Sequence, residues 1–152
     1  MPLIALLRGV LCGPPPPMDD TSTTALCDAL IHGRQHVGPK HLVAPAPDER
    51  ELRALFEAAA AAPDHRQLRP WRFLVLGAAA RQRLAEVFSE ALLARDAAAT
   101  PEQLADAREK ALRGPVLILA VADLRSEEPE VPVDERLVSL GCAIQNLLLA
   151  AS

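Results

Sequence analysis

The chain of 152 residues has few aromatic side chains: they make up 3% of it, with one tryptophan, three phenylalanines and no tyrosine. Alanine and leucine must therefore supply most of the core. Cysteine is also scarce, and Cys12, Cys27 and Cys142 lie far apart without a Cys-x-x-Cys spacing. This usage argues against a disulfide scaffold and predicts a reducing, cytoplasmic environment.

An excess of basic charge and long apolar runs are absent as well. The formal net charge is −4 at pH 7, whereas general nucleic-acid binding requires a basic face. The apolar stretch at residues 3–7 is too short to span a bilayer, and no small-residue cleavage pattern follows it. We therefore expect no nucleic-acid partner and no membrane span. Because 50% of the residues are hydrophobic, we expect one globular domain.

Proline, in contrast, is plentiful, and four of the 14 prolines form an unbroken run at residues 14–17. Such a run is a stiff, extended spacer. We expect residues 1–20 to be a disordered leader, although residues 1–17 are equally explained by a reading frame that begins too early. The domain itself then occupies residues 21–152.

Two capping boxes mark the best-defined helices. One begins at Asp48 and the other at Thr100, and each is followed three residues later by a Glu or Gln. The first helix should end before Pro63, and the second should run to the stop at Gly114 and Pro115. Apolar spacing predicts three further helices: one capped by Thr21 or Ser22 and ending near Gly33, one with Leu84, Val87, Phe88, Ala91 and Leu92 on its apolar face, and one at residues 137–151.

Two apolar runs, at residues 72–76 and 116–122, predict strands. The second run is unbroken, which is typical of a strand covered on both faces by helices at the middle of a sheet. Two strands do not make a stable sheet. The helix at residues 137–151 is apolar nearly all round, which places it centrally or at a subunit interface, and no stop signal precedes Ser152. We therefore expect part of the domain to be missing, or to be supplied by partners.

The polar stretch between the first capped helix and the first strand is the candidate functional site. Polar groups this dense at a helix-to-strand connection usually line a site, although a plain solvated connection remains an alternative. The residues are Asp64, His65, Arg66, Gln67 and Arg69, enclosed by Pro63 and Pro70 and followed by Trp71.

Other kinds of chemistry have weaker support. His32 and His36 are four residues apart and Cys27 and His41 are nearby, but Gly33 breaks the helix that would align these groups as metal ligands. The sequence has no Ser-His-Asp or Cys-His spacing for nucleophilic catalysis. We expect no metal site and nominate no catalytic side chain.

The segment PAPDERELRALFEAAAAAPDHRQLRPWRFLVL, residues 45–76, resembles the nitroreductase family of flavin-dependent oxidoreductases. The likeness is strongest to a short bacterial branch with APDH before a Pro-Trp pair. GRQHVGPKHL, ATPEQLADAREKALRGPVLILAVA and SLGCAIQNLLLAAS follow the order of that family, so the resemblance covers about residues 25–152. It implies an α+β nitroreductase-like fold, with helices packed on both faces of a central mixed sheet, truncated at its C-terminus in this chain.

The resemblance also implies an extensive homodimer that binds FMN at the subunit interface. Arg34 stands where the family has an arginine that holds the FMN phosphate, a task that suits a planar guanidinium. Gln35 and His36 replace the family's commoner Arg and Ser/Thr beside it. Later segments of the family, which complete the phosphate site and part of the flavin pocket, would lie beyond Ser152.

The resemblance further implies that the loop before the Pro-Trp pair supplies flavin contacts from the partner subunit. They fall on His65 directly and on Ala61 more weakly, because relatives often have an arginine at position 61. Gln67 stands where many relatives have an asparagine that faces the isoalloxazine.

The implied function is to pass hydride from NAD(P)H through FMN to a nitroaromatic, a quinone or a similar small-molecule acceptor. The cofactor performs the difficult step, so no catalytic side chain is required. Arg66, Arg69 and Arg72 would attract phosphate-bearing donors, or else are ordinary solvated charges. The alternative is a truncated, non-catalytic nitroreductase-like fragment or scaffold with weak or no flavin binding. The sequence names neither the acceptor nor the preferred nicotinamide.

Overall fold

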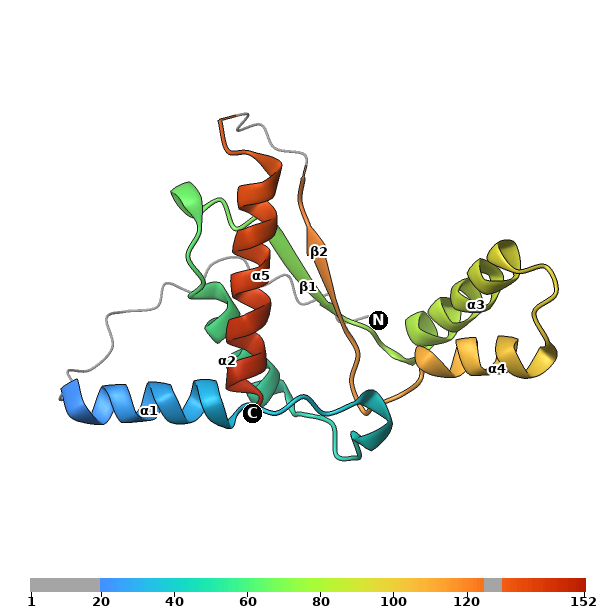
Figure 1. The fold of residues 1–152 in the computed structure, drawn as a ribbon, viewed down its shortest axis with the longest axis horizontal. Coiled ribbons are helices and arrows are strands. Elements are labelled where there is room, and N and C mark those ends of the chain that lie inside the picture. Colours follow the sequence, from blue (N-terminus) through green and yellow to red (C-terminus); the bar gives the residue numbers. More distant parts are fainter. Residues whose placement is uncertain (1–19, 125–129) are drawn as a thin grey trace. The chain divides into compact units, whose positions relative to one another are not determined.

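A computed structural model describes residues 20–124 and 130–152 of the chain (Figure 1). The expected leader, except for Asp20, and the loop at residues 125–129 lie outside the described residues. In chain order the elements are α1 Asp20–Gly33, η1 Pro39–His41, α2 Glu49–Ala60, η2 His65–Gln67, β1 Trp71–Val75, α3 Ala78–Arg95, α4 Pro101–Lys110, β2 Ile118–Ala122 and α5 Val133–Ala150.

The described chain divides into two compact units. The first contains η1, α3 and α4, within residues 37–46 and 74–119. The second contains α1, α2, η2 and α5, and includes residues 47–73 and the described residues from 120 onward. The candidate site lies entirely within the second unit.

The two strands form a two-stranded antiparallel sheet. The Asp123 N–H donates to the Pro70 carbonyl at 2.8 Å, and the Leu76 N–H donates to the Leu117 carbonyl at 2.9 Å. Partners that move in opposite directions along the chain define an antiparallel pair. Both expected strands are confirmed to within two residues, in a mixed helix-and-sheet fold that is incomplete, as expected.

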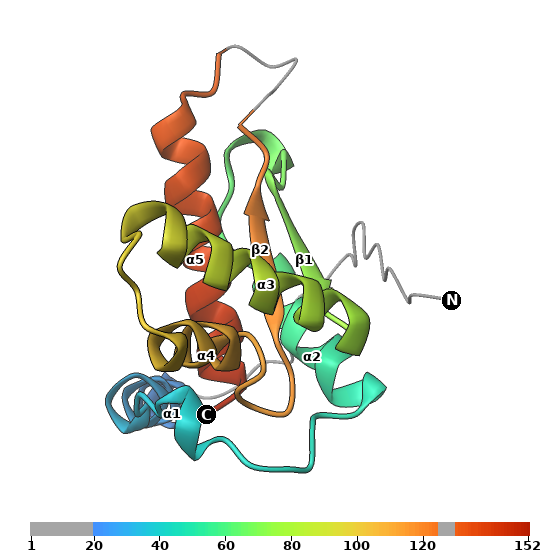
Figure 2. The same ribbon diagram turned by 90° about the vertical axis from the view of Figure 1, so that its right-hand side faces the viewer.

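In the second unit, α2 and α5 pack side by side on the sheet, as Figures 1 and 2 show. Ala59 and Ala143 are completely buried at the centre of this unit, and Trp71 and Phe73 of β1 pack against them. Phe56 of α2 stacks on Phe73 with ring centroids 5.8 Å apart. The core therefore depends on alanine, as expected, but no leucine of the described residues is among the buried ones, so the expectation for leucine is wrong.

Both predicted capping boxes are confirmed. The Asp48 carboxylate accepts from the Glu51 N–H at 2.8 Å, and the Glu51 carboxylate accepts from the Asp48 N–H at 2.8 Å. Thr100 and Gln103 exchange the same pair of bonds at the start of α4. An N-cap of this kind contributes about 1 kcal/mol to helix stability.

In the first unit, α3 and α4 pack against each other, and Arg81 of α3 binds the end of α4. Its Nε donates to the Ala111 carbonyl at 3.0 Å, and its Nη2 donates to the carbonyls of Arg113 and Gly114 at 2.9 and 3.0 Å. These carbonyls have left the helical ladder, and Gly114 has a left-handed φ of 72°. The helix therefore ends at Lys110, before the predicted stop.

Two helices begin earlier than expected. α5 starts at Val133 rather than at residue 137, because Pro132 and the acidic first turn with Asp134 and Glu135 favour a helix start there. α1 starts at Asp20, so the expectation that Thr21 or Ser22 caps it is wrong. All residues of α1 from 21 to 33 are exposed.

The apolar face predicted for α3 is wrong in part, and α5 too buries small side chains. Ala85 and Ser89 are the buried residues of α3, whereas Val87 is 52% exposed. In α5 the buried residues include Ser139 and Ala143, whereas the large Leu137 and Leu148 are exposed. Small side chains occupy these close contacts because large ones would hold the helices apart.

The expectation that the second strand is covered on both faces is also wrong within the described chain. Leu119, in the middle of β2, is 46% exposed, and β2 pairs with β1 alone in the described sheet.

Candidate functional site

The loop between α2 and β1 has a backbone conformation that L-amino acids rarely adopt. α2 ends at Ala60, Ala61 caps it, and the chain turns at Pro63. Three of the next residues, Arg66, Gln67 and Arg69, have positive φ angles of 56°, 54° and 46°. Each left-handed residue without glycine costs about 1–2 kcal/mol. Such outliers cluster at binding and catalytic sites, where the surrounding structure holds them in place.

Asp64 organises this loop from inside. Its carboxylate accepts a short hydrogen bond from the backbone N–H of Arg69, and its carbonyl accepts from the N–H of Gln67 at 3.4 Å. The Trp71 N–H then donates to the Arg69 carbonyl at 2.7 Å, where β1 begins. A hydrogen bond to a charged group contributes about 1.5–3 kcal/mol, which offsets the cost of one or two left-handed residues.

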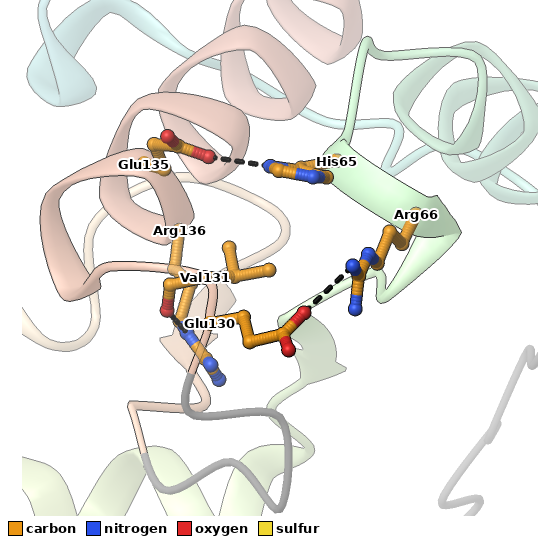
Figure 3. Close-up of polar contacts among 6 residues, drawn as sticks. All are labelled: His65, Arg66, Glu130, Val131, Glu135 and Arg136. Atoms are coloured by element: carbon orange, nitrogen blue, oxygen red, sulfur yellow. Dashed lines mark hydrogen bonds and ion pairs between the residues drawn. The ribbon is translucent and has the colours of Figure 1, made fainter.

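Two acidic side chains near the start of α5 hold the loop from outside (Figure 3). His65 Nδ1 lies 2.8 Å from Glu135 Oε2, and Arg66 Nη2 lies 2.7 Å from Glu130 Oε2. Next to them, the Arg136 side chain is buried and its Nε donates to the Val131 carbonyl at 3.0 Å. Both contacts are about half exposed, so each contributes at most about 1 kcal/mol.

The loop borders a cavity of about 240 Å³. One wall is made by the small side chains of Ala60 and Ala62, and the polar side is made by Asp64, Gln67 and Arg69. Complete small-molecule pockets span roughly 300–1,000 Å³, so this cavity alone is smaller than a typical complete site.

The residues that the resemblance nominates fall into two groups in the structure. Ala61, His65 and Gln67 lie on the same loop, and all three are exposed. Arg34 is half-buried directly after α1, and Gln35 and His36 are exposed beyond it.

Within residues 20–124 and 130–152, no hydrogen bond or ion pair joins Arg34 to His65. The described part of this single chain therefore brings the loop residues together, but no hydrogen bond or ion pair in it joins them to Arg34, the residue nominated to bind the phosphate.

Two further findings concern other kinds of site. Over the described ranges, no group of three or more His, Cys, Asp and Glu side chains is arranged to hold a metal ion. None of the helices seen in this part of the chain is long and apolar enough to cross a membrane.

Comparison with known proteins shows which family the chain belongs to. The nitroreductase family model matches residues 39–152, which include α2, the strained loop, both strands and α5. The chain belongs to the nitroreductase family.

Two relatives agree with this assignment. The chain is 38% identical over 124 residues to a Haemophilus influenzae protein that carries a provisional name as an NAD(P)H nitroreductase; the match covers 82% of this chain and 66% of that protein. It is 33% identical over 110 residues to Escherichia coli YdjA, which has the same provisional description; that match covers 72% of this chain and 58% of YdjA. The chain thus spans about three-fifths to two-thirds of the length of these relatives.

A solved structure supports the fold. The FMN-dependent nitroreductase NfnB from Mycobacterium smegmatis, in complex with NADPH, aligns with a TM-score of 0.60 and 19% sequence identity, over 84% of this chain and 70% of NfnB. At this identity the likeness establishes a shared nitroreductase fold.

Sequence reasoning found this nitroreductase loop but missed the residues that hold it. Glu135 lies 70 residues from His65 in the chain, so no local pattern joins the two. The available signal was Pro132 followed by two acidic residues, which marks the start of a helix. Asp64 was noted only as one polar residue among several.

Proposed function

We propose that this chain is part of an FMN-dependent oxidoreductase that passes hydride from NAD(P)H to a nitroaromatic, a quinone or a similar small acceptor. The observation that carries the proposal is the strained loop at residues 64–69, which places Gln67 at the cavity and leaves His65 exposed on the same loop. This loop is the segment whose APDH and Pro-Trp residues resemble the family's flavin-binding loop. A backbone held at this cost is expected where a ligand needs a fixed geometry.

Each nominated residue has a role that its chemistry supports. Arg34 holds the phosphate of FMN through its planar guanidinium, with Gln35 and His36 beside it. Gln67 faces the ring system from the loop, and Ala61 leaves space where relatives often have an arginine. FMN, when bound, accepts and donates the hydride, so the side chains bind and orient the reactants.

The proposal includes a homodimer, in which the loop of one subunit meets Arg34 of its partner. The described part of a single chain joins the two groups by no polar contact. The apolar residues Leu26, Leu30 and Ile31 of α1 are 41–60% exposed, which leaves a helix face for a partner subunit to cover. We also propose a cytoplasmic location, because the scattered cysteines suit a reducing environment.

Arg69 and Arg72 are proposed to attract the phosphate groups of the nicotinamide donor by long-range charge. Arg66 already forms an ion pair with Glu130 at 2.7 Å, so its charge is partly neutralised for that purpose.

The second candidate function is a non-catalytic nitroreductase-like scaffold with weak or no flavin binding. The observations that favour it are the small size of the cavity and the two-stranded sheet. The cavity is too small to enclose a flavin and the sheet has only two strands in the described chain, so an enclosed flavin site would need further protein surface.

Titration of the purified chain with FMN, followed by flavin fluorescence and visible absorption, distinguishes these functions. We expect saturable binding, NAD(P)H oxidation that depends on bound FMN and on an added quinone, and at least tenfold weaker binding by Arg34→Ala. The matched control Arg83→Ala, an exposed arginine of α3, should bind normally. A colourless protein with no saturable FMN binding would refute the enzyme and favour the scaffold.

Mixing two defective variants tests the shared site. If Arg34 and His65 of one site come from different subunits, heterodimers of Arg34→Ala and His65→Ala contain one intact site and one doubly defective site. Random reassociation should then restore about a quarter of the wild-type sites, because half of the dimers are mixed. No restoration on mixing would place both residues in one subunit.

A further inference from the structure

The His65 ring is held by a carboxylate from another part of the chain. Its Nδ1 lies 2.8 Å from Glu135 Oε2, and Figure 3 shows Glu135 reaching the ring from the first turn of α5. An ionised carboxylate can only accept hydrogen bonds. The hydrogen of this bond must therefore reside on Nδ1, whether the imidazole is neutral or carries a second proton.

We propose that Glu135 is a positioning residue for flavin binding, which fixes a hydrogen on Nδ1 of His65 and leaves Nε2 as the nitrogen that meets the ligand. In a neutral ring Nε2 is then a hydrogen-bond acceptor. It selects a donor on the cofactor, such as the imide N–H of the isoalloxazine or a ribityl hydroxyl, over a carbonyl or phosphate oxygen. The flavin part of this inference rests on the function proposed above, whereas the position of the hydrogen does not.

The other charged groups around the ring are engaged in ways that leave this pairing intact. Arg66, the next residue, directs its Nη2 to Glu130 at 2.7 Å. The buried Arg136, the residue after Glu135, donates its Nε to the Val131 carbonyl at 3.0 Å. Both guanidiniums therefore bind other oxygens, and the Glu135 carboxylate contacts the imidazole.

The rigidity of both partners makes the contact a means of orientation. Glu135 lies in the first turn of an 18-residue helix whose middle is buried against α2. His65 begins a loop whose next two residues are left-handed, so its backbone has few alternatives. A ring held between two ordered elements loses little entropy when a ligand binds, which is the general advantage of a preorganised site.

The side-chain ¹⁵N signals of His65 in the full chain, measured at mildly alkaline pH before FMN is added, test the position of the hydrogen. His65→Gln assigns the signals among the four histidines. We expect a protonated Nδ1 and a bare Nε2 in the wild type and in Glu135→Gln, whose amide oxygen still accepts. Glu135→Ala should lose this preference. Asp134→Ala is the matched control, because it removes an exposed carboxylate from the same helix turn without touching His65.

FMN affinity of the same four proteins tests the consequence. Loss of one oriented hydrogen bond should raise the dissociation constant of Glu135→Ala about five- to tenfold, whereas Glu135→Gln and Asp134→Ala should stay within about twofold of wild type. An unchanged hydrogen position in Glu135→Ala would overturn the inference, as would a lost preference with unchanged FMN affinity. If the wild type binds no FMN, the proposed function and the flavin part both fail, while the ¹⁵N result still decides where the hydrogen lies.

Discussion

Replacing Gln67 by glycine is expected to stabilise the protein while weakening the proposed binding of flavin. Gln67 has a φ of 54°, which costs an L-amino acid about 1–2 kcal/mol, whereas glycine adopts it without steric conflict. Glycine also lowers the free energy of unfolding by about 0.5–1 kcal/mol, because it has greater conformational entropy in the unfolded chain. The net gain is about 0.5–1 kcal/mol, since the backbone hydrogen bond from Gln67 to Asp64 is retained.

Denaturant unfolding followed by the fluorescence of Trp71 measures this gain directly, because Trp71 is the only tryptophan and directly follows the loop. The melting temperature should rise by about 1–4 °C for a domain of this size. The matched control is Gln82→Gly, the same substitution at an exposed position of α3, which should lose about 1 kcal/mol. The reasoning is refuted if Gln67→Gly destabilises the protein as much as Gln82→Gly does.

Three further changes test other parts of the fold. Asp64→Ala should cost about 1.5–3 kcal/mol and speed hydrogen exchange at the Arg69 amide, which the carboxylate now holds; an unchanged exchange rate would contradict this role. Arg81→Ala should cost about 1–3 kcal/mol in unfolding free energy, because three carbonyls at the end of α4 lose a charged donor; a loss below about 0.3 kcal/mol would mean that water replaces it. The Glu109 pKa is lowered by its hydrogen bond and charge interaction with Arg113, so this pair stabilises the fold above the carboxyl's ordinary pKa and stops doing so as pH falls through the lowered value. Glu109→Gln should therefore flatten the acid side of a plot of melting temperature against pH, and an identical acid side would show that the pair contributes nothing.

Local signals in the sequence predicted local structure well. Asp48 and Thr100 begin helices because each capping box needs only residues three positions apart. The strand before Gly77 and the polar loop after Pro63 were found for the same reason. The choice of the loop as the site also came from neighbouring residues.

Interactions between distant segments could not be predicted in this way. The tie between His65 and Glu135 depends on how α5 packs, and the left-handed Arg66, Gln67 and Arg69 carry no glycine or asparagine to announce them. The apolar face predicted for α3 failed similarly, because close helix contacts selected alanine and serine over larger apolar side chains.

The exposure of α1 has a consequence for the stability of this helix. A 14-residue helix whose residues from 21 to 33 are all exposed gains little from packing within its own chain, and isolated helices of this length are marginal. In the proposed homodimer, a partner subunit that covers Leu26 and Leu30 would stabilise this helix. The helical content of the N-terminal segment should therefore grow as the protein is concentrated and melt away on dilution, even while α2 and α5 remain folded.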